Sequence, residues 1–191
     1  MISFLSRLGL ILPPPIKGEL VSLQPFQRRH LRLIREWFKD EDLLRLAFGV
    51  SADSDTLLNL GRDFLKDLFF SSKELLMVTL PDQGAIGLVS FAIREEEGKI
   101  ARVGILIGEV RRRRRGYGTD ALKALIAHLF EKRKVRRVEL DTALFNDQAQ
   151  RCFLRCGFKK TGELSEIDFR NGQAVNKVMM GITREEYFSH D

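Results

Sequence analysis

The hydrophobic and polar positions in the first third of the chain predict one strand followed by helices. Residues 19–24 alternate apolar and polar side chains, which is typical of a half-buried strand. Residues 27–40, 43–49 and 57–70 instead carry apolar side chains three and four positions apart, so each segment would present one apolar face as a helix. We therefore expect a strand and three helical segments before residue 74.

The middle of the chain predicts three consecutive strands, at residues 74–80, 85–93 and 100–108. Each is a short run rich in apolar and β-branched side chains. Turn-forming residues lie between them, at 81–84 and again at 95–98. Because such short turns join neighbouring strands, we expect these three strands to form an antiparallel meander.

The last third of the chain alternates helices and strands. Residues 120–130 have one apolar helix face, residues 136–142 predict a strand, and a short helix follows Asn146. Two further strands, at 158–169 and 173–182, flank Asn171-Gly172, which is a strong signal for a two-residue hairpin turn. The order predicts an α+β fold with one mixed sheet, formed by a single domain at 16–191 that follows an N-terminal extension at 1–15.

The first candidate for a functional site is the loop between the strand at 100–108 and the helix at 120–130. It contains five arginines, Arg111–Arg115, followed by Gly116, Tyr117, Gly118 and Thr119. The first N–H groups of a helix lack intrahelical partners, and the helix dipole adds positive charge there. Glycine lets the backbone approach a ligand closely, and arginine adds charge for phosphate. The loop therefore predicts a phosphate cradle.

The spacing of the glycines in this loop does not match two other phosphate-binding motifs. A dinucleotide-binding fingerprint requires a third glycine where the chain has Ala121, and the G-x-x-x-x-G-K-[ST] pattern of a P-loop is absent. A solvated basic loop or a nucleic-acid patch stays open from the charges alone. The run has few interleaved aromatic side chains, so we expect no specific nucleic-acid partner.

Two motifs carry a family resemblance. Arg113-x-x-Gly116-x-Gly118 resembles the acyl-CoA loop of the GNAT superfamily of N-acetyltransferases. The segment from Asn146 to Phe158 resembles a later motif of that superfamily, in which an asparagine opens a short helix that ends in Gly-Phe. Local physics agrees, because asparagine is a good N-cap and Gly157 stands where a left-handed residue ends a helix. The motifs occur in the superfamily's order, and the resemblance extends from Ile16 to Phe188.

The resemblance implies a mostly antiparallel twisted sheet with a central parallel pair of strands that splay apart, and helices on both faces. It also implies acetyl-CoA as co-substrate and direct transfer of the acetyl group to a primary amine. Backbone groups at Leu106, Gly108 and Val110 would pair with the pantetheine arm like an additional strand. The full set implied for acetyl-CoA is Leu106, Gly108, Val110, Arg111, Arg113, Arg114, Arg115, Gly116, Tyr117, Gly118, Thr119, Asn146 and Phe153.

Two carboxylates are candidates for the base that deprotonates the amine. Asp141 lies on the second splayed strand, and Glu109 ends the first. Each could equally be a solvated carboxylate paired with an arginine. Phe153 stands where many relatives have a tyrosine that protonates the leaving thiolate, and phenylalanine cannot donate a proton. A water acting as acid, a slower enzyme, or a CoA-binding protein without turnover would each be consistent with this change.

The substrate is the least determined property. The N-terminal half resembles the ribosomal-protein (Rim-type) branch of the superfamily, and the C-terminal part also resembles spermidine acetyltransferases. We expect a protein or peptide N-terminal amine, with a ribosomal protein among the candidates, and polyamines or aminoglycosides as the alternative. A homodimer is left open.

Charge, cysteine and hydropathy narrow the class of protein. The net charge is +6, which favours an anionic ligand such as coenzyme A. The only two cysteines, Cys152 and Cys156, are expected as core or half-buried thiols rather than as a disulfide or metal site, and with them a cytoplasmic location. We expect no metal and no membrane association. His30, His128 and His190 are expected at the surface.

Overall fold

The structure is a computed structural model that describes residues 14–48, 59, 62–63, 66, 73–95, 98–168 and 173–189. Most of the helix expected at 57–70, the hairpin turn at Asn171-Gly172, and residues 1–13 lie outside the described residues. No helix in the described part of the chain is long and apolar enough to cross a membrane.

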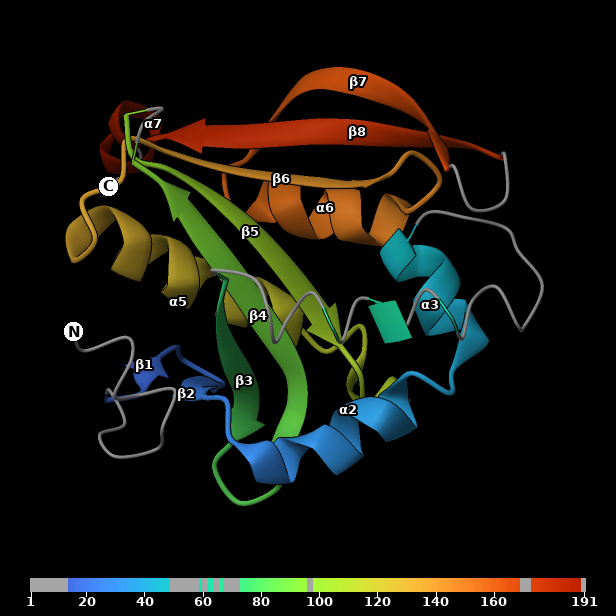
Figure 1. The fold of residues 1–191 in the computed structure, drawn as a ribbon. Coiled ribbons are helices and arrows are strands. Elements are labelled where there is room, and N and C mark those ends of the chain that lie inside the picture. The colour runs from blue at the N-terminus through green and yellow to red at the C-terminus, as the bar shows by residue number, and fades with distance from the viewer. Residues whose placement is uncertain are drawn as a thin grey trace.

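One eight-stranded sheet organises the fold, in the order β1-β2-β3-β4-β5-β6-β8-β7 (Figure 1). All neighbouring strands are antiparallel except β5 and β6, which are parallel. The strands are β1 (Ile16–Lys17), β2 (Ser22–Pro25), β3 (Glu74–Leu80), β4 (Gly84–Arg94), β5 (Ile100–Ile107), β6 (Arg137–Ala143), β7 (Lys159–Asp168) and β8 (Gln173–Thr183). The predicted α+β class and the predicted meander of β3, β4 and β5 are confirmed.

Helices cover both faces of the sheet. They are the 3-10 helices η1 (Arg28–His30) and η2 (Val110–Arg112), and the α-helices α2 (Leu31–Trp37), α3 (Glu41–Phe48), α5 (Tyr117–Glu131), α6 (Asp147–Arg155) and α7 (Arg184–Phe188). The sequence pattern predicted α2, α3, α5 and α6 within a few residues. It missed β1, η2 and α7, because these elements are only two, three and five residues long, too short for a periodic pattern to show.

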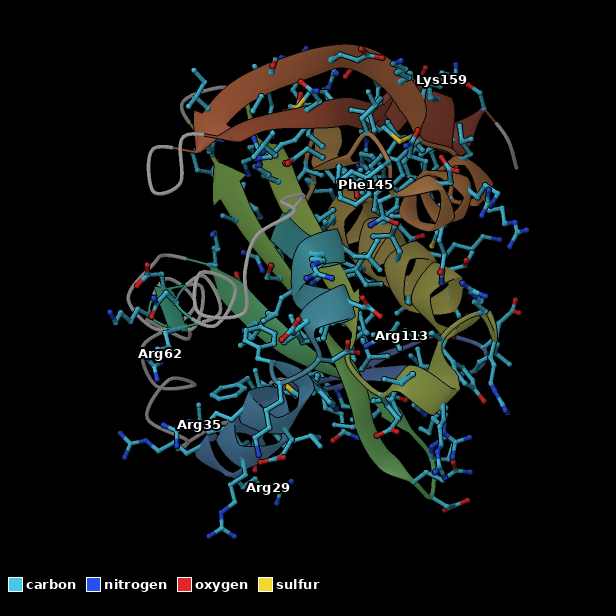
Figure 2. All side chains as sticks on the ribbon, turned by 90° about the vertical axis from the view of Figure 1, so that its right-hand side faces the viewer. Arg29, Arg35, Arg62, Arg113, Phe145 and Lys159 are labelled. Carbon is cyan, nitrogen blue, oxygen red and sulfur yellow. The ribbon has the colours of Figure 1, made fainter. Side chains whose placement is uncertain are left out.

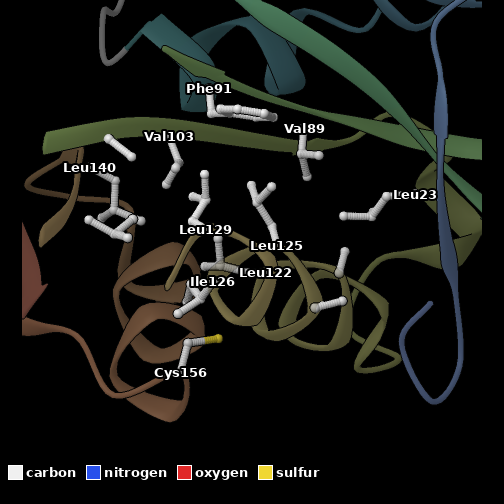
Figure 3. Packing of buried hydrophobic residues seen from close by; sticks show 14 of the residues in the cluster. Leu23, Val89, Phe91, Val103, Leu122, Leu125, Ile126, Leu129, Leu140 and Cys156 are labelled. Carbon is white, nitrogen blue, oxygen red and sulfur yellow. The ribbon is translucent and has the colours of Figure 1, made fainter. Parts of the chain in front are cut away.

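The larger core lies between the sheet and α5. Side chains from one face of α5, including Leu122, Leu125 and Leu129, pack against strand residues such as Val89 and Phe91 (Figure 3). The predicted apolar face of the helix at 120–130 is thereby confirmed. Because the side chains of this apolar face lose contact with water, burial fixes how α5 is oriented on the sheet.

A second apolar cluster lies on the opposite face of the sheet, under α2 and α3. Ile34 and Trp37 of α2 and Leu44 of α3 pack onto Leu88 and Leu106 of the sheet. Ile34 and Trp37 lie on the apolar face that the helical spacing at 27–40 predicted. The two clusters position α2 and α5 on either side of β5, at the end where β5 leaves β6.

Candidate active site

The site begins where β5 and β6 separate. The two strands pair only at Ile100–Arg137, Ala101–Val138 and Arg102–Glu139, and then diverge (Figure 1). Beyond that point, among the described residues, β5 pairs only with β4, and β6 only with β8. In this part of the structure, each strand therefore has one edge without a neighbouring strand. An extended ligand can bind along such an edge by main-chain hydrogen bonds.

The N-terminus of α5 lies next to this opening. Gly116 is the N-cap and has a left-handed backbone, with φ of 84°, which glycine adopts without steric cost. Within the described residues, no side-chain hydrogen bond caps α5. Its first N–H groups are therefore open to an anion, and the helix dipole favours negative charge at the same place. This arrangement fits the pyrophosphate of coenzyme A.

Arg113 faces inward rather than toward the open end of α5. Its Nε donates to the carbonyl of Ile107 at 2.9 Å, and its terminal nitrogen donates to the carbonyl of Gly108 at 3.1 Å. The same guanidinium pairs with Asp40 at 2.8 Å. Arg113 therefore fixes the path of the loop, and its direct contact with a phosphate stays a prediction.

The remaining arginines of the run divide into two that have a hydrogen-bond partner and two that have none among the described residues. Arg112 donates to Gln83, and Arg114 donates to Gln148 of α6 at 3.3 Å. Arg111 and Arg115 are exposed and have no hydrogen bond or ion pair within the described residues. These two are the arginines of the loop that remain available for a ligand's phosphates.

Asp120 contributes to the cradle in a way that the sequence did not reveal. Its carboxylate accepts hydrogen bonds from the backbone N–H groups of Glu19, Leu20 and Val21, at 3.0, 2.8 and 2.9 Å. These bonds fasten the turn between β1 and β2 to the first turn of α5. An acidic residue in a first helical turn was visible in the sequence, but its partners lie about a hundred residues away.

Gly108 is a position of close approach by a side chain of the protein itself, and its pairing with the pantetheine arm stays a prediction. A Cβ added to Gly108 would lie 2.0 Å from the indole of Trp37. Trp37 is buried, and its Nε1 has no hydrogen-bond partner within the described part of the chain. The ring thereby forms the wall of the site where β5 ends. Leu106 is buried beneath α2, and Val110 is 57% exposed.

The two candidate bases have different surroundings. Asp141 lies in ion pairs with Arg102 and, at 3.6 Å, with Lys177, so each of its oxygens faces a cation. Glu109 is the N-cap residue of η2 and donates its backbone N–H to the carbonyl of Ile86 at 3.0 Å. Its carboxylate has no partner within the described residues. Within the described residues Glu109 is thus an unpaired carboxylate, whereas Asp141 is part of a charged cluster at the fork.

The α6 motif folds as its sequence predicts. Asn146 is the N-cap, and its side-chain oxygen accepts from the N–H of Ala149 at 3.1 Å. Its amide nitrogen lies 3.4 Å from the carbonyl of Leu46 in α3, so the residue also ties α3 to the site. Gly157 has the expected left-handed backbone, with φ of 87°. Phe153 is buried against Phe158, and its contact with acetyl-CoA stays a prediction.

Cys152 and Cys156 are free thiols, half-buried and buried, as expected. Cys152 Sγ lies 3.3 Å from Thr119 Oγ1, in the first turn of α5. A hydrogen bond from Cys156, together with Thr119, lowers the pKa of Cys152 to about 7, although burial acts in the opposite direction. The hydrogen bond to Cys152 and burial raise the pKa of Cys156.

Comparison with known proteins agrees with this geometry. Residues 21–159 match the acetyltransferase (GNAT) domain family. The fold is similar to an acetyltransferase of the GNAT family from Bacillus anthracis, with a TM-score of 0.72, 17% identity, and coverage of 90% of this chain and 99% of that one. It is also similar to spermidine N-acetyltransferase from Vibrio cholerae, in complex with CoA and spermine, with a TM-score of 0.71, 21% identity, and coverage of 90% and 99%. The chain therefore belongs to the GNAT family of acetyltransferases, whose acetyl donor is acetyl-CoA.

Proposed function

We propose that the chain transfers the acetyl group of acetyl-CoA to a primary amine at the N-terminus of a protein or peptide. The observation that carries this choice of amine is the charge around the fork of β5 and β6. Asp141 and Asp40 are already paired with Arg102, Lys177 and Arg113. A polyamine carries several positive charges and needs unpaired carboxylates, whereas a peptide terminus carries one charge and needs only one.

Glu109 is the residue proposed to accept the proton of the amine. An amine is cationic in water and must lose a proton before it can attack a carbonyl carbon. Glu109 lies two residues beyond the end of β5 and has no cation within 4.0 Å in the described part of the chain, so the carboxylate is available directly or through a water molecule. Asp141 would act through its ion pairs with Arg102 and Lys177, which brace β6 against β5 and β8.

Acetyl-CoA supplies an acetyl group already activated as a thioester, so the chain need not form an acyl-enzyme. The protein's part is to hold the donor along the free edge of β5, with N–H groups of that edge facing the carbonyl oxygen where negative charge develops. Phe153 cannot protonate the departing thiolate, so water would supply that proton. A thiolate leaves readily, and the missing acid would cost rate rather than prevent the reaction.

The experiment combines calorimetry with an assay of thiol release. We expect micromolar or tighter binding of acetyl-CoA, and release of CoA with a panel of N-terminal peptides but not with spermidine or an aminoglycoside. Turnover with spermidine alone would show that the substrate is a polyamine rather than a peptide. Spermidine is the substrate named for the similar enzyme from Vibrio cholerae. Binding without thiol release from any amine would identify a CoA-binding protein instead.

Variants distinguish the two carboxylates. Glu109→Gln should lower kcat by roughly 10²–10⁴-fold with an unchanged Kd for acetyl-CoA, because only proton transfer is lost. Asp141→Asn should have a smaller effect on kcat and should lower stability, since it removes two ion pairs. Glu185→Gln, on the exposed surface of α7, is the matched control. Equal activity of the Glu109 and Glu185 variants would exclude Glu109 as the base.

A further inference from the structure

The outer face of η1 and α2 carries a line of exposed arginines that the acetyl-transfer site does not use. Arg28, Arg29, Arg32 and Arg35 are all exposed, and we call these four residues the arginine stripe. Figure 2 shows Arg29 of η1 and Arg35 of α2 projecting outward. Positions 28, 32 and 35 are spaced four and three residues apart, so their side chains share one side of the helix.

The charges of the stripe are not neutralised. By contrast, Arg45 lies near Glu41, Arg133 near Glu74, and Lys159 near Glu186. Within the described residues, no carboxylate lies within salt-bridge distance of the four stripe arginines. Arg29 contacts only the ring of His30, at 3.5 Å, and the one acidic residue of α2, Glu36, is paired with Lys39. Concentrated, unneutralised charge costs stability through self-repulsion.

The chemistry of the stripe points to phosphate groups arranged along a line. All four residues are arginines, whose planar guanidinium can bind a phosphate by two hydrogen bonds and is weakly hydrated compared with an ammonium group. Seven residues of helix place the charges over about 10 Å. That length matches several successive phosphates of a nucleic-acid strand, which carries one charge at each nucleotide.

A membrane surface fits the stripe less well. Helices that bind membranes expose large apolar side chains beside their basic residues. On α2 the apolar residues Ile34 and Trp37 are buried in the core, so they cannot enter a bilayer without unfolding the helix. No aromatic side chain of α2 is exposed for stacking on bases either, which leaves contact with the phosphate backbone.

We propose that the arginine stripe binds the phosphate backbone of nucleic acid without preference for base sequence. The stripe is rigidly connected to the active site. Trp37, in the same helix, packs on Gly108 of the site, and Asp40, just beyond the helix, pairs with Arg113 of the cradle at 2.8 Å. A nucleic acid held on the stripe therefore lies on the outside of the helix whose inner face closes the site.

The test is the salt dependence of binding of a fluorescent single-stranded RNA of twenty nucleotides and mixed sequence. Saturating acetyl-CoA is present to occupy the second basic surface, at Arg111–Arg115. With four phosphate contacts, affinity should fall roughly fiftyfold between 50 and 200 mM salt. The triple variant R28Q/R32Q/R35Q should bind more weakly and lose only about threefold over the same range, because about one contact remains.

The matched control is K132Q/K134Q/R136Q, which removes the same charge from exposed positions beyond the C-terminal end of α5. It should retain the affinity and salt dependence of the unmodified chain. Equal loss in both variants would show attraction by net charge alone, and no loss in the stripe variant would exclude this surface. If a glutamate-rich peptide bound the stripe as tightly as the RNA, the ligand would be an acidic protein and the proposal of nucleic acid would be wrong. Acetyl-CoA affinity, measured on every variant, reports separately on the cradle.

Discussion

At the scale of single residues, the site depends on places where a side chain would not fit. Gly108 and Gly18 are the clearest cases, since an added Cβ would lie 2.0 Å from the Trp37 indole and 2.4 Å from an Asp120 oxygen. Both contacts bring a distant helix against the loops that border the opening. The glycines are therefore required by packing between elements.

The substitution Gly108→Ala should lower the free energy of unfolding by about 1–3 kcal/mol, because the new methyl group displaces a buried ring that has no room to move. Gly162→Ala is the control, since nothing lies within 4 Å of an added Cβ there and its φ is ordinary. The control should stay within about 0.5 kcal/mol of the unmodified chain. Urea denaturation at constant m-value measures both. Equal midpoints for the two variants would contradict the close packing of Trp37 on Gly108.

At the scale of elements, three helices differ in how the free N–H groups of their first turn are capped. Asn146 caps α6, and Thr183 and Glu186 cap α7 reciprocally. For α5, no capping hydrogen bond comes from a side chain in the part of the chain that the structure describes. The carboxylate in its first turn, Asp120, instead points away to the turn between β1 and β2. A helix start that is left open beside two glycines and exposed arginines is the element-level basis for the anion site.

Replacing Asp120 by alanine should therefore uncouple β1 and β2 from α5. Three backbone N–H groups lose a charged acceptor, and we expect a loss of about 1–3 kcal/mol in the free energy of unfolding. Asp147, in the first turn of α6, is exposed and accepts no hydrogen bond from a distant described segment, so Asp147→Ala should cost about 0.5 kcal/mol or less. Thermal denaturation of the pair provides the comparison. If the Asp147 variant proved the less stable of the two, the proposed role of Asp120 would be wrong.

At the scale of the whole molecule, two partly buried histidines link stability to pH. They were expected at the surface, but burial lowers the pKa of both His30 and His128, with further lowering from Arg29 and Arg133 respectively. His30 Nδ1 accepts a hydrogen bond from the N–H of Gln27 at 3.1 Å, which requires an unprotonated nitrogen. The folded state therefore binds protons less readily than the unfolded chain at both positions.

This stability is fully present above pH 6.5, the ordinary histidine value, and is lost as the pH falls from there through the lower pKa of the folded state. We expect the urea midpoint to decrease between pH 6.5 and 5.0, and the double variant H30Q/H128Q to show a flatter profile. The ratio of the two slopes is the measured quantity. Parallel profiles would assign the acid sensitivity to other groups.

Local patterns and long-range contacts differ in how far the sequence reveals them. Features that follow from neighbouring residues could be predicted. They are the cap at Asn146, the left-handed Gly157 and the succession of strands along the chain. The inward course of Arg113 could not, because its partner Asp40 is 73 residues away. Likewise, the pairing of Asp141 with Arg102 and Lys177 depends on which strands become neighbours in the sheet.

The fork between β5 and β6 divides the backbone hydrogen bonding of the sheet into two half-sheets, β1–β5 and β6–β8, which share only three residue pairs. A donor molecule that lies along the open edge supplies bonds that the chain itself lacks. Amide protons on both sides of the fork should then exchange with solvent together, quickly in the free protein and slowly in the complex. The donor molecule thus supplies backbone hydrogen bonds that the sheet lacks at the fork. A variant that binds the donor more weakly should therefore also show faster amide exchange at this edge.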